Sequence, residues 1–223
     1  MGWIFRYLTS SVGKKQVMAL TGLLLLLFLV GHLGGNFLLF LGAGPFNSYS
    51  HALISNPLII PIELGLLAIF LVHIGLAIWV SIENKLARPD PYAHPLCEGK
   101  QGLSSSTMLI TGGALILFVV VHILGLKYGT YYWAAASDGT VIRDVYKLVL
   151  EYFKNPGMLL FYAASMIVLG VHLTHAFWSA CQTIGLSHKK YTPILRGLSV
   201  LLALGLAAGF LFVILFASQA KVG

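Results

Sequence analysis

Apolar residues gather in five long runs that are separated by short polar or basic segments. The runs cover residues 15–40, 58–82, 104–126, 157–184 and 194–217. Each run exceeds the roughly 20 residues that a helix needs to cross the hydrocarbon core of a bilayer. The pattern therefore predicts an all-α integral membrane protein that is built as a five-helix bundle.

The composition supports a membrane protein with a single domain. Of the 223 residues, 58% are hydrophobic and 9% are charged, which is far from the usual balance of soluble domains. No polar segment is long enough to bury a core of its own, so we expect residues 1–223 to form one transmembrane domain. Residues 1–15 carry aromatic and basic side chains and no small-residue cleavage site. We therefore expect the first span to be retained rather than removed as a signal peptide.

Lysine and arginine are unevenly divided between the two sides of the predicted spans. The side of the N-terminus carries Arg6, Lys14, Lys15, Lys85, Arg88, Lys100, Lys189, Lys190 and Arg196. The other side carries Lys127, Arg143, Lys147, Lys154 and Lys221. Because basic residues favour the cytoplasmic side, this distribution predicts a cytoplasmic N-terminus. The net charge of +7 then mainly reflects the topology. Nucleic-acid binding is not expected, because the sequence has no cluster of basic residues on a soluble face.

The first four runs each contain a histidine near the middle: His32, His73, His122 and His172. An ionisable side chain in hydrocarbon is costly unless it has a partner or a function. A rise of about 1.5 Å per residue places His32 and His122 in the outer half of the membrane and His73 and His172 in the inner half. The two pairs are then roughly 10 to 15 Å apart. Two facing pairs of imidazoles predict the axial ligands of two stacked b haems. Hydrogen bonding between helices is the alternative for any single membrane histidine.

Glycines surround these histidines and bear on the same hypothesis. They are Gly31, Gly34, Gly35, Gly75, Gly125 and Gly170. A porphyrin that lies flat against helices needs backbone without bulky side chains, which favours glycine. Glycine also lets membrane helices approach one another, so helix packing is the alternative explanation for each position.

Four segments resemble the cytochrome b subunit that anchors succinate dehydrogenase and fumarate reductase complexes, in the form that carries two haems on one chain. The segments are 28–36 (FLVGHLGGN), 44–51 (GPFNSYSH), 71–76 (LVHIGL) and 172–179 (HLTHAFWS). The resemblance covers the first four runs in order and spacing. The fifth run has no candidate ligand, which is also similar to the family.

The resemblance implies a ligand set for each haem. It assigns His73 and His172 to the inner haem and His32 and His122 to the outer haem. These assignments agree with the depths of the four histidines in their runs.

A second histidine in the fourth run, His175, lies only three residues after His172, and depth does not separate the two. In the family, the ligand precedes the residues that match Trp178 and Ser179 by six and seven positions. That pattern selects His172, and His175 is then expected either to donate a hydrogen bond behind the ligands or to contact a haem edge.

The resemblance also implies partners and a location. It implies that a flavoprotein with covalent FAD and an iron–sulfur protein bind the cytoplasmic face of a bacterial inner membrane. Electrons would then pass through both haems to a quinone, which is expected to be menaquinone. The dicarboxylate reaction then takes place on a partner subunit, and the complex belongs to the respiratory chain and the tricarboxylic acid cycle. The resemblance leaves open whether the complex forms a higher oligomer. The expected docking segments are 83–103, with His94, Pro95 and Lys100, and 185–193.

Several further residues are candidates for supporting roles. Glu63 is the one acidic residue well inside a predicted span, so it is a candidate for quinone or proton chemistry; a solvated helix start is the alternative. His51 lies in the segment 47–51, which is either part of the family pattern or a capping and turn sequence. Candidate contacts of the inner haem propionates are Lys15 and Lys189, together with Arg6, Lys14, Gln16, His188 and Lys190, and their alternative role is interfacial anchoring.

The sequence also excludes some chemistry on this chain. Cys97 and Cys181 form no CxxC pair, so neither an iron–sulfur ligand set nor a covalent c-type haem is expected, and both thiols fall on the reducing cytoplasmic side. A dihaem subunit of a nitrate reductase or a hydrogenase is the alternative within electron transfer. A transporter in which the histidines and Glu63 relay protons is the alternative from another class, and the lack of an inverted repeat disfavours it.

Overall fold

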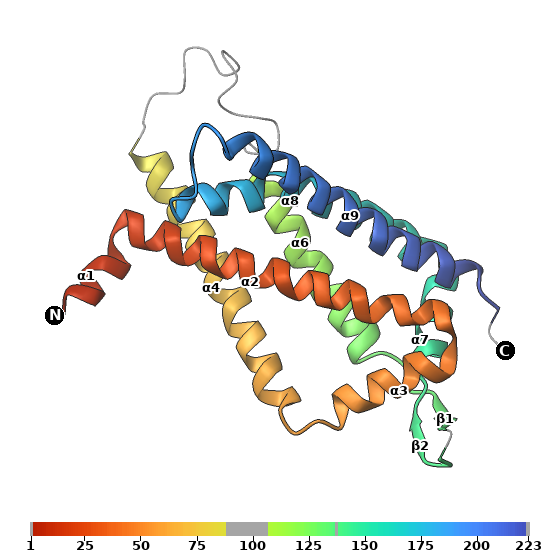
Figure 1. Cartoon of the computed structure of the whole chain (residues 1–223). Helices are drawn as coiled ribbons and strands as arrows, with labels where there is room; N and C mark the ends of the chain where they lie inside the picture. Colours follow the sequence, from red (N-terminus) through yellow and green to blue (C-terminus); the bar gives the residue numbers. More distant parts are fainter. Residues whose placement is uncertain (1, 88–106, 137, 222–223) are drawn as a thin grey trace.

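The computed structural model describes residues 2–87, 107–136 and 138–221 (Figure 1). Within these ranges, five helical stretches are long and apolar enough to cross a membrane, which confirms the predicted number of spans and the all-α class. They are α2 (Ser11–Phe37) with the 3-10 turn η1 (Leu38–Leu41), α4 (Ile59–Leu86), α6 (Met108–His122) with the π-helical turn η2 (Ile123–Lys127), α8 (Pro156–Thr183) and α9 (Thr192–Gln219). Residues 104–106 of the predicted third run lie outside the described residues.

Side chains cap the beginnings of α2 and α8 by accepting hydrogen bonds from free backbone amides. The Ser10 hydroxyl accepts a hydrogen bond from the Gly13 amide at the start of α2. The Asn155 side chain accepts hydrogen bonds from two amides at the start of α8, where Pro156 takes the first helical position. Helix α4 runs past the predicted end at residue 82, and in this last part the Glu83 carboxylate accepts a hydrogen bond from Trp79 Nε1 one turn earlier.

The five long helices alternate in direction, and we name the two ends of the bundle by what they carry. The Lys14 end holds the beginnings of α2, α6 and α9. It also carries the short helix α1 (Trp3–Thr9). The hairpin end holds the beginnings of α4 and α8 together with the strands β1 (Trp133–Ala135) and β2 (Val141–Arg143), which pair antiparallel with Trp133 opposite Arg143.

Two short helices complete the hairpin end, α3 (Ala43–Ile54) and α7 (Val145–Lys154). Asn47 on α3 is buried; its Nδ2 donates to Asp144 Oδ1 over 2.8 Å, and its Oδ1 accepts from the Tyr146 amide over 2.8 Å. Asp144 also caps α7 by accepting from the Lys147 amide. The turn interpretation of residues 47–51 is therefore wrong, because this segment is helical and its asparagine fastens α3 to α7.

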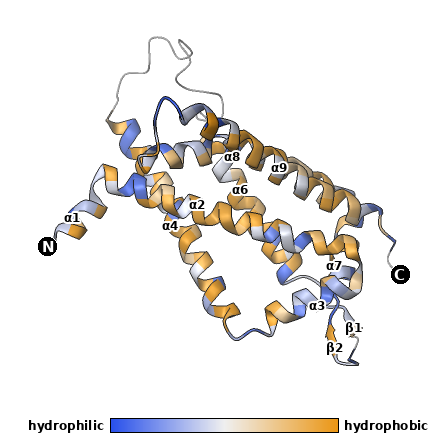
Figure 2. Cartoon of the chain, in the orientation of Figure 1, coloured by the Kyte–Doolittle hydropathy of each residue, from blue (hydrophilic) through white to orange (hydrophobic). Residues whose placement is uncertain are grey.

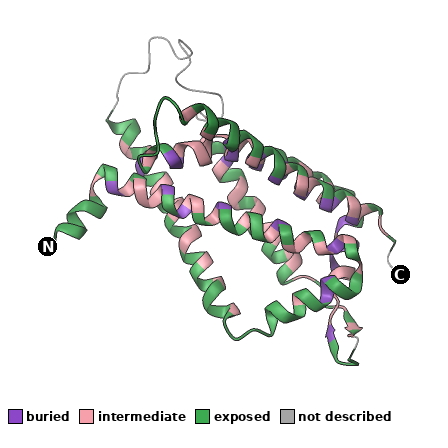
Figure 3. Ribbon diagram, viewed as in Figure 1, coloured by how far each residue is buried: buried purple, intermediate pink, exposed green. Residues whose placement is uncertain are grey.

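The buried core lies mainly between α2, α7, α8 and α9 (Figure 3). Small residues allow the close approach of α8 and α9, since a Cβ on Gly170 would lie 3.2 Å from Ala207 Cβ. Ser199 of α9 is almost fully buried, and its hydroxyl is 2.8 Å from the Thr174 carbonyl oxygen of α8. Both contacts are typical of membrane helices, where small and hydroxylated side chains hold neighbours together.

Helices α4 and α6 contribute little to this core. Val80 is the one buried residue that α4 contributes among the described residues, and Thr111 is the one that α6 contributes. Their exposed faces are nevertheless apolar over most of their length (Figure 2). An apolar surface of this kind suits contact with lipid, because hydrocarbon chains solvate leucine and isoleucine as well as a protein core does.

Candidate functional site

Two of the four membrane histidines meet directly in the half of the bundle nearer the hairpin end. His32 on α2 and His122 at the end of α6 have ring centroids 5.7 Å apart and ring planes 86° apart. Two imidazoles that bind one metal from opposite sides have ring centroids about 6 Å apart. Each metal–nitrogen bond is about 2 Å long, and each ligating nitrogen lies about 1 Å from the centroid of its ring. The spacing of this hairpin-end pair therefore suits two ligands on opposite sides of one metal.

Aromatic side chains enclose the hairpin-end pair. The Phe28 ring stacks on His32 with centroids 5.3 Å apart and planes 15° apart, and Phe210 of α9 lies 5.8 Å away. Around His122, the Phe118 ring is 5.6 Å away, and the Tyr162 hydroxyl lies 3.4 Å from His122 Nδ1. The described neighbours of the pair are aromatic rings, with the Tyr162 hydroxyl as a polar neighbour of His122 Nδ1.

The other two histidines lie nearer the Lys14 end. His73 comes from α4 and His172 from α8, and each lies past the midpoint of its helix counted from the hairpin end. Both side chains are only partly buried by protein. We call these residues the Lys14-end pair.

Hydrogen bonds define the tautomer of His73. Its Nδ1 lies 3.1 Å from the Met18 carbonyl oxygen and 3.2 Å from Thr21 Oγ1, both on α2. A carbonyl oxygen can only accept, so Nδ1 must carry the hydrogen. In a neutral imidazole the other nitrogen, Nε2, then has a free lone pair, which is the form that binds a metal.

The same argument applies to His172. Its Nδ1 lies 3.1 Å from Thr111 Oγ1 on α6. The Thr111 hydroxyl hydrogen already has acceptors in its own helix, the carbonyl oxygens of Thr107 and Met108 at 3.0 and 3.2 Å. With its hydrogen donated within α6, the Thr111 oxygen has lone pairs that can accept from Nδ1–H, the tautomer that would leave a free lone pair on His172 Nε2.

Two imidazoles are the number of protein ligands that a haem iron can take. Within the described part of the chain, no group of three or more His, Cys, Asp or Glu residues is placed to hold a metal. A zinc site needs three or four such ligands, whereas haem iron takes four nitrogens from the porphyrin and needs only two from the protein. Paired neutral imidazoles with free Nε2 atoms meet that requirement.

The glycines near the histidines divide into two groups. A Cβ on Gly31, Gly34 or Gly75 would have no other atom within 4 Å, so these three border open space, as a flat cofactor or lipid would require.

A Cβ on the remaining three glycines would meet a protein neighbour. Gly35 faces the Tyr49 ring, Gly125 faces the Tyr152 ring, and Gly170 faces Ala207. For these three positions the porphyrin interpretation is wrong, because they serve the packing of protein against protein.

The lesser candidates for haem contact lie at the Lys14 end. His175 is half-buried and within electrostatic range of His172. Lys15 and Lys189 are exposed, as are Arg6, His188 and Lys190.

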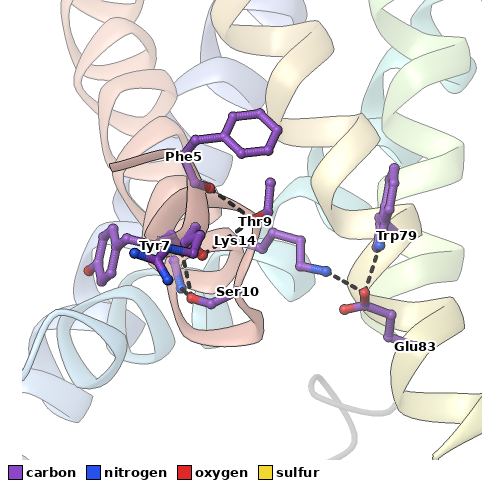
Figure 4. A network of polar contacts seen from close by, with 9 residues as sticks. Phe5, Tyr7, Thr9, Ser10, Lys14, Trp79 and Glu83 are labelled. Atoms are coloured by element: carbon purple, nitrogen blue, oxygen red, sulfur yellow. Dashed lines mark hydrogen bonds and ion pairs between the residues drawn. The ribbon is translucent and has the colours of Figure 1, made fainter. Parts of the chain in front are cut away.

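Lys14 and Gln16 are already engaged by other side chains. The Lys14 ammonium forms an ion pair with Glu83 and lies 5.2 Å from the centre of the Trp79 ring (Figure 4). The Gln16 side-chain oxygen accepts a hydrogen bond from the Tyr7 hydroxyl. These contacts fasten α1 and α4 to the beginning of α2.

Glu63 lies near the beginning of α4 at the hairpin end. Its carboxylate is 2.5 Å from the ammonium of Lys127 at the end of η2, and both side chains are 43% exposed. A half-exposed ion pair at this position joins α4 to α6 and remains open to its surroundings.

Other candidates lie away from both pairs or outside the described residues. His51 is exposed on α3. Cys181 is a buried free thiol on α8. Cys97, His94, Pro95, Lys100 and most of the expected docking segment 83–103 fall outside the residues that the structure describes.

The hydroxyl partners of the Lys14-end pair, Thr21 and Thr111, were missed in the sequence analysis. A signal for them is present, because each threonine precedes a glycine and stands eleven positions before a candidate ligand, His32 or His122. The repeated spacing is visible only once two spans are aligned on their histidines.

Comparison of the chain with protein-family models, with curated proteins and with solved structures found no match.

Proposed function

We propose that this chain is the dihaem cytochrome b anchor of a succinate:quinone oxidoreductase. The observation that carries the proposal is the apposition of His32 and His122, whose ring centroids lie 5.7 Å apart. The free Nε2 atoms inferred for His73 and His172 support a second pair of ligands. The sequence segments that resemble the dihaem anchor family supply the identity of the complex.

In this proposal the chain provides ligands and an apolar enclosure. His32 and His122 hold one haem, and His73 and His172 hold the other. When bound, two b haems supply one-electron transfer along a route across the membrane. Phe28, with the other aromatic rings around the hairpin-end pair, excludes water from that part of the route.

The proposed orientation follows from the basic residues. The Lys14 end faces the cytoplasm, where a flavoprotein with FAD oxidises the dicarboxylate and an iron–sulfur subunit passes electrons to this chain. Electrons enter near the Lys14-end pair and leave at the hairpin-end pair, where a quinone, menaquinone in the proposal, takes up two electrons and two protons. The membrane is then the bacterial inner membrane, and the chain is a multi-pass subunit.

Glu63 is the candidate for the proton step. It is an acidic side chain at the hairpin end, and its carboxylate forms an ion pair with Lys127. Its partial exposure gives it access to the surroundings. Its place in the proposal is to accept or release protons near the quinone.

The first test is a visible difference spectrum of the native detergent-solubilised complex. We expect a b-type band after reduction with succinate and a further rise after dithionite, from a second haem of lower potential. A band that appears only with dithionite would keep the haem assignment and point to another partner, such as a nitrate reductase or a hydrogenase. No band at all would overturn the haem assignment and favour a proton-coupled transporter.

A further inference from the structure

Each histidine of the Lys14-end pair contacts a threonine on a neighbouring helix. Thr21 on α2 contacts His73 on α4, and Thr111 on α6 contacts His172 on α8. Both threonines are buried, with exposed fractions of 7% and 8%. The helix pair α2–α4 thus repeats the contact made by the pair α6–α8.

Each threonine hydroxyl is oriented to accept from a histidine. The Thr21 hydroxyl lies 2.9 Å from the carbonyl oxygens of Val17 and Met18 in its own helix, and it donates its one hydrogen there. Thr111 is equally occupied as a donor within α6. A hydroxyl oxygen keeps acceptor lone pairs after donating, so each is available to an imidazole Nδ1–H.

The glycine that follows each threonine leaves room for the imidazole. A Cβ on Gly22 would lie 3.1 Å from His73 Cε1, and a Cβ on Gly112 would lie 3.7 Å from His172 Cε1. Gly22 therefore leaves the space that the His73 ring needs, whereas a methyl group at Gly112 would make an ordinary contact with His172.

We propose that Thr21 and Thr111 are positioning residues that hold His73 and His172 with the hydrogen on Nδ1 and the Nε2 lone pair directed to one haem. The inference rests on the proposed haem function and adds two residues to it. An acceptor at Nδ1–H fixes the ring orientation and raises the basicity of the ligating nitrogen. A more basic ligand stabilises ferric iron, so these threonines lower the reduction potential of the Lys14-end haem.

The two sites differ in a way that sharpens the test. His73 Nδ1 has a second acceptor in the Met18 carbonyl oxygen at 3.1 Å, whereas among the described residues Thr111 is the one hydrogen-bond partner of His172 Nδ1. Removing the Thr111 hydroxyl therefore leaves a ring without its acceptor. Removing the Thr21 hydroxyl leaves one acceptor in place.

The experiment compares Thr111→Val, Thr111→Ser and Thr21→Val in the whole purified complex. Thr183→Val is the matched control, because the Thr183 hydroxyl donates to the Ser179 carbonyl oxygen of its own helix. The readouts are haem content per chain, a redox titration of both haems and the electron paramagnetic resonance signals of the ferric haems. Thr111→Ala is the second variant if valine is not accommodated.

We expect Thr111→Val to shift the midpoint of one haem upward and to weaken its binding about 10-fold, with the other haem unchanged. Thr21→Val should shift the same haem by less, and Thr111→Ser should restore the wild-type midpoint. A wild-type titration with two haems that neither Thr111→Val nor Thr111→Ala alters would overturn this inference alone. A wild-type complex without b-type absorption would overturn the proposed function as well.

Discussion

The imidazole rings of His32 and His122 lie edge to face, with centroids 5.7 Å apart and planes 86° apart. They come from the first and third spans, which run in the same direction from the Lys14 end. Parallel spans bring residues of similar depth to one level, which places the hairpin-end pair side by side. The second and fourth spans supply the other pair in the same way.

Alanine substitution of a histidine from each pair should remove a different haem. We expect His122→Ala to lose one of two haems and His73→Ala to lose the other, because each haem loses an axial ligand that no neighbour replaces. Haem per chain and the reduced difference spectrum measure this outcome. His51→Ala, on the exposed face of α3, should keep both haems. Full haem content in His122→Ala would show that the ligand assignment is wrong.

The two glycines beside the Lys14-end pair should differ in their tolerance of a methyl group. In Gly22→Ala the new Cβ lies 3.1 Å from His73 Cε1, so the ring or α2 must move. In Gly112→Ala the corresponding distance to His172 is 3.7 Å, an ordinary contact. We expect Gly22→Ala to alter the spectrum of one haem and Gly112→Ala to leave it unchanged. Equal spectra for both variants would contradict this geometry.

Asn47 should stabilise the hairpin end. Asn47→Ala removes the partner of Asp144 and of the Tyr146 amide, which we expect to cost about 1–3 kcal/mol because buried polar groups lose their hydrogen bonds. Asn47→Asp should be worse, since a second carboxylate would face Asp144. Thermal unfolding in detergent measures both, and Asn56→Ala, an exposed asparagine that accepts from Leu58, is the control. Equal midpoints for Asn47→Ala and the control would refute the role of Asn47.

The contact between α2 and α9 beside His32 should be sensitive to added volume. A Cβ on Gly209 would lie 2.6 Å from Leu33 Cδ2, so we expect Gly209→Ala to cost about 1–3 kcal/mol through overpacking. Gly205→Ala, on the same helix with no atom within 4 Å of the new Cβ, should cost nothing.

A double-mutant cycle tests that contact directly. Leu33→Ala removes the side chain that Gly209→Ala would strike, so the double variant should lose less stability than the sum of the two single variants. Chemical unfolding in detergent gives the three free energies. Strict additivity would mean that the two residues do not contact each other in the folded protein.

The sequence alone determined the five spans to within a few residues at most ends. A bilayer requires about 20 apolar residues in a helix that satisfies its own backbone, and that requirement is local to each segment. The depth of each histidine in its span was also readable, because depth depends only on position along a helix. That two haems occupy these levels remains a prediction.

Only the tertiary structure determined which side chains of different helices contact one another. It placed Thr21 and Thr111 on His73 and His172, and it folded residues 43–54 into α3 against α7. It also turned Gly35, Gly125 and Gly170 toward protein neighbours. These relationships depend on the rotation of each helix about its axis. Since lipid and the protein interior are equally apolar, hydrophobic patterning does not encode that rotation, and contacts between small and polar side chains set it.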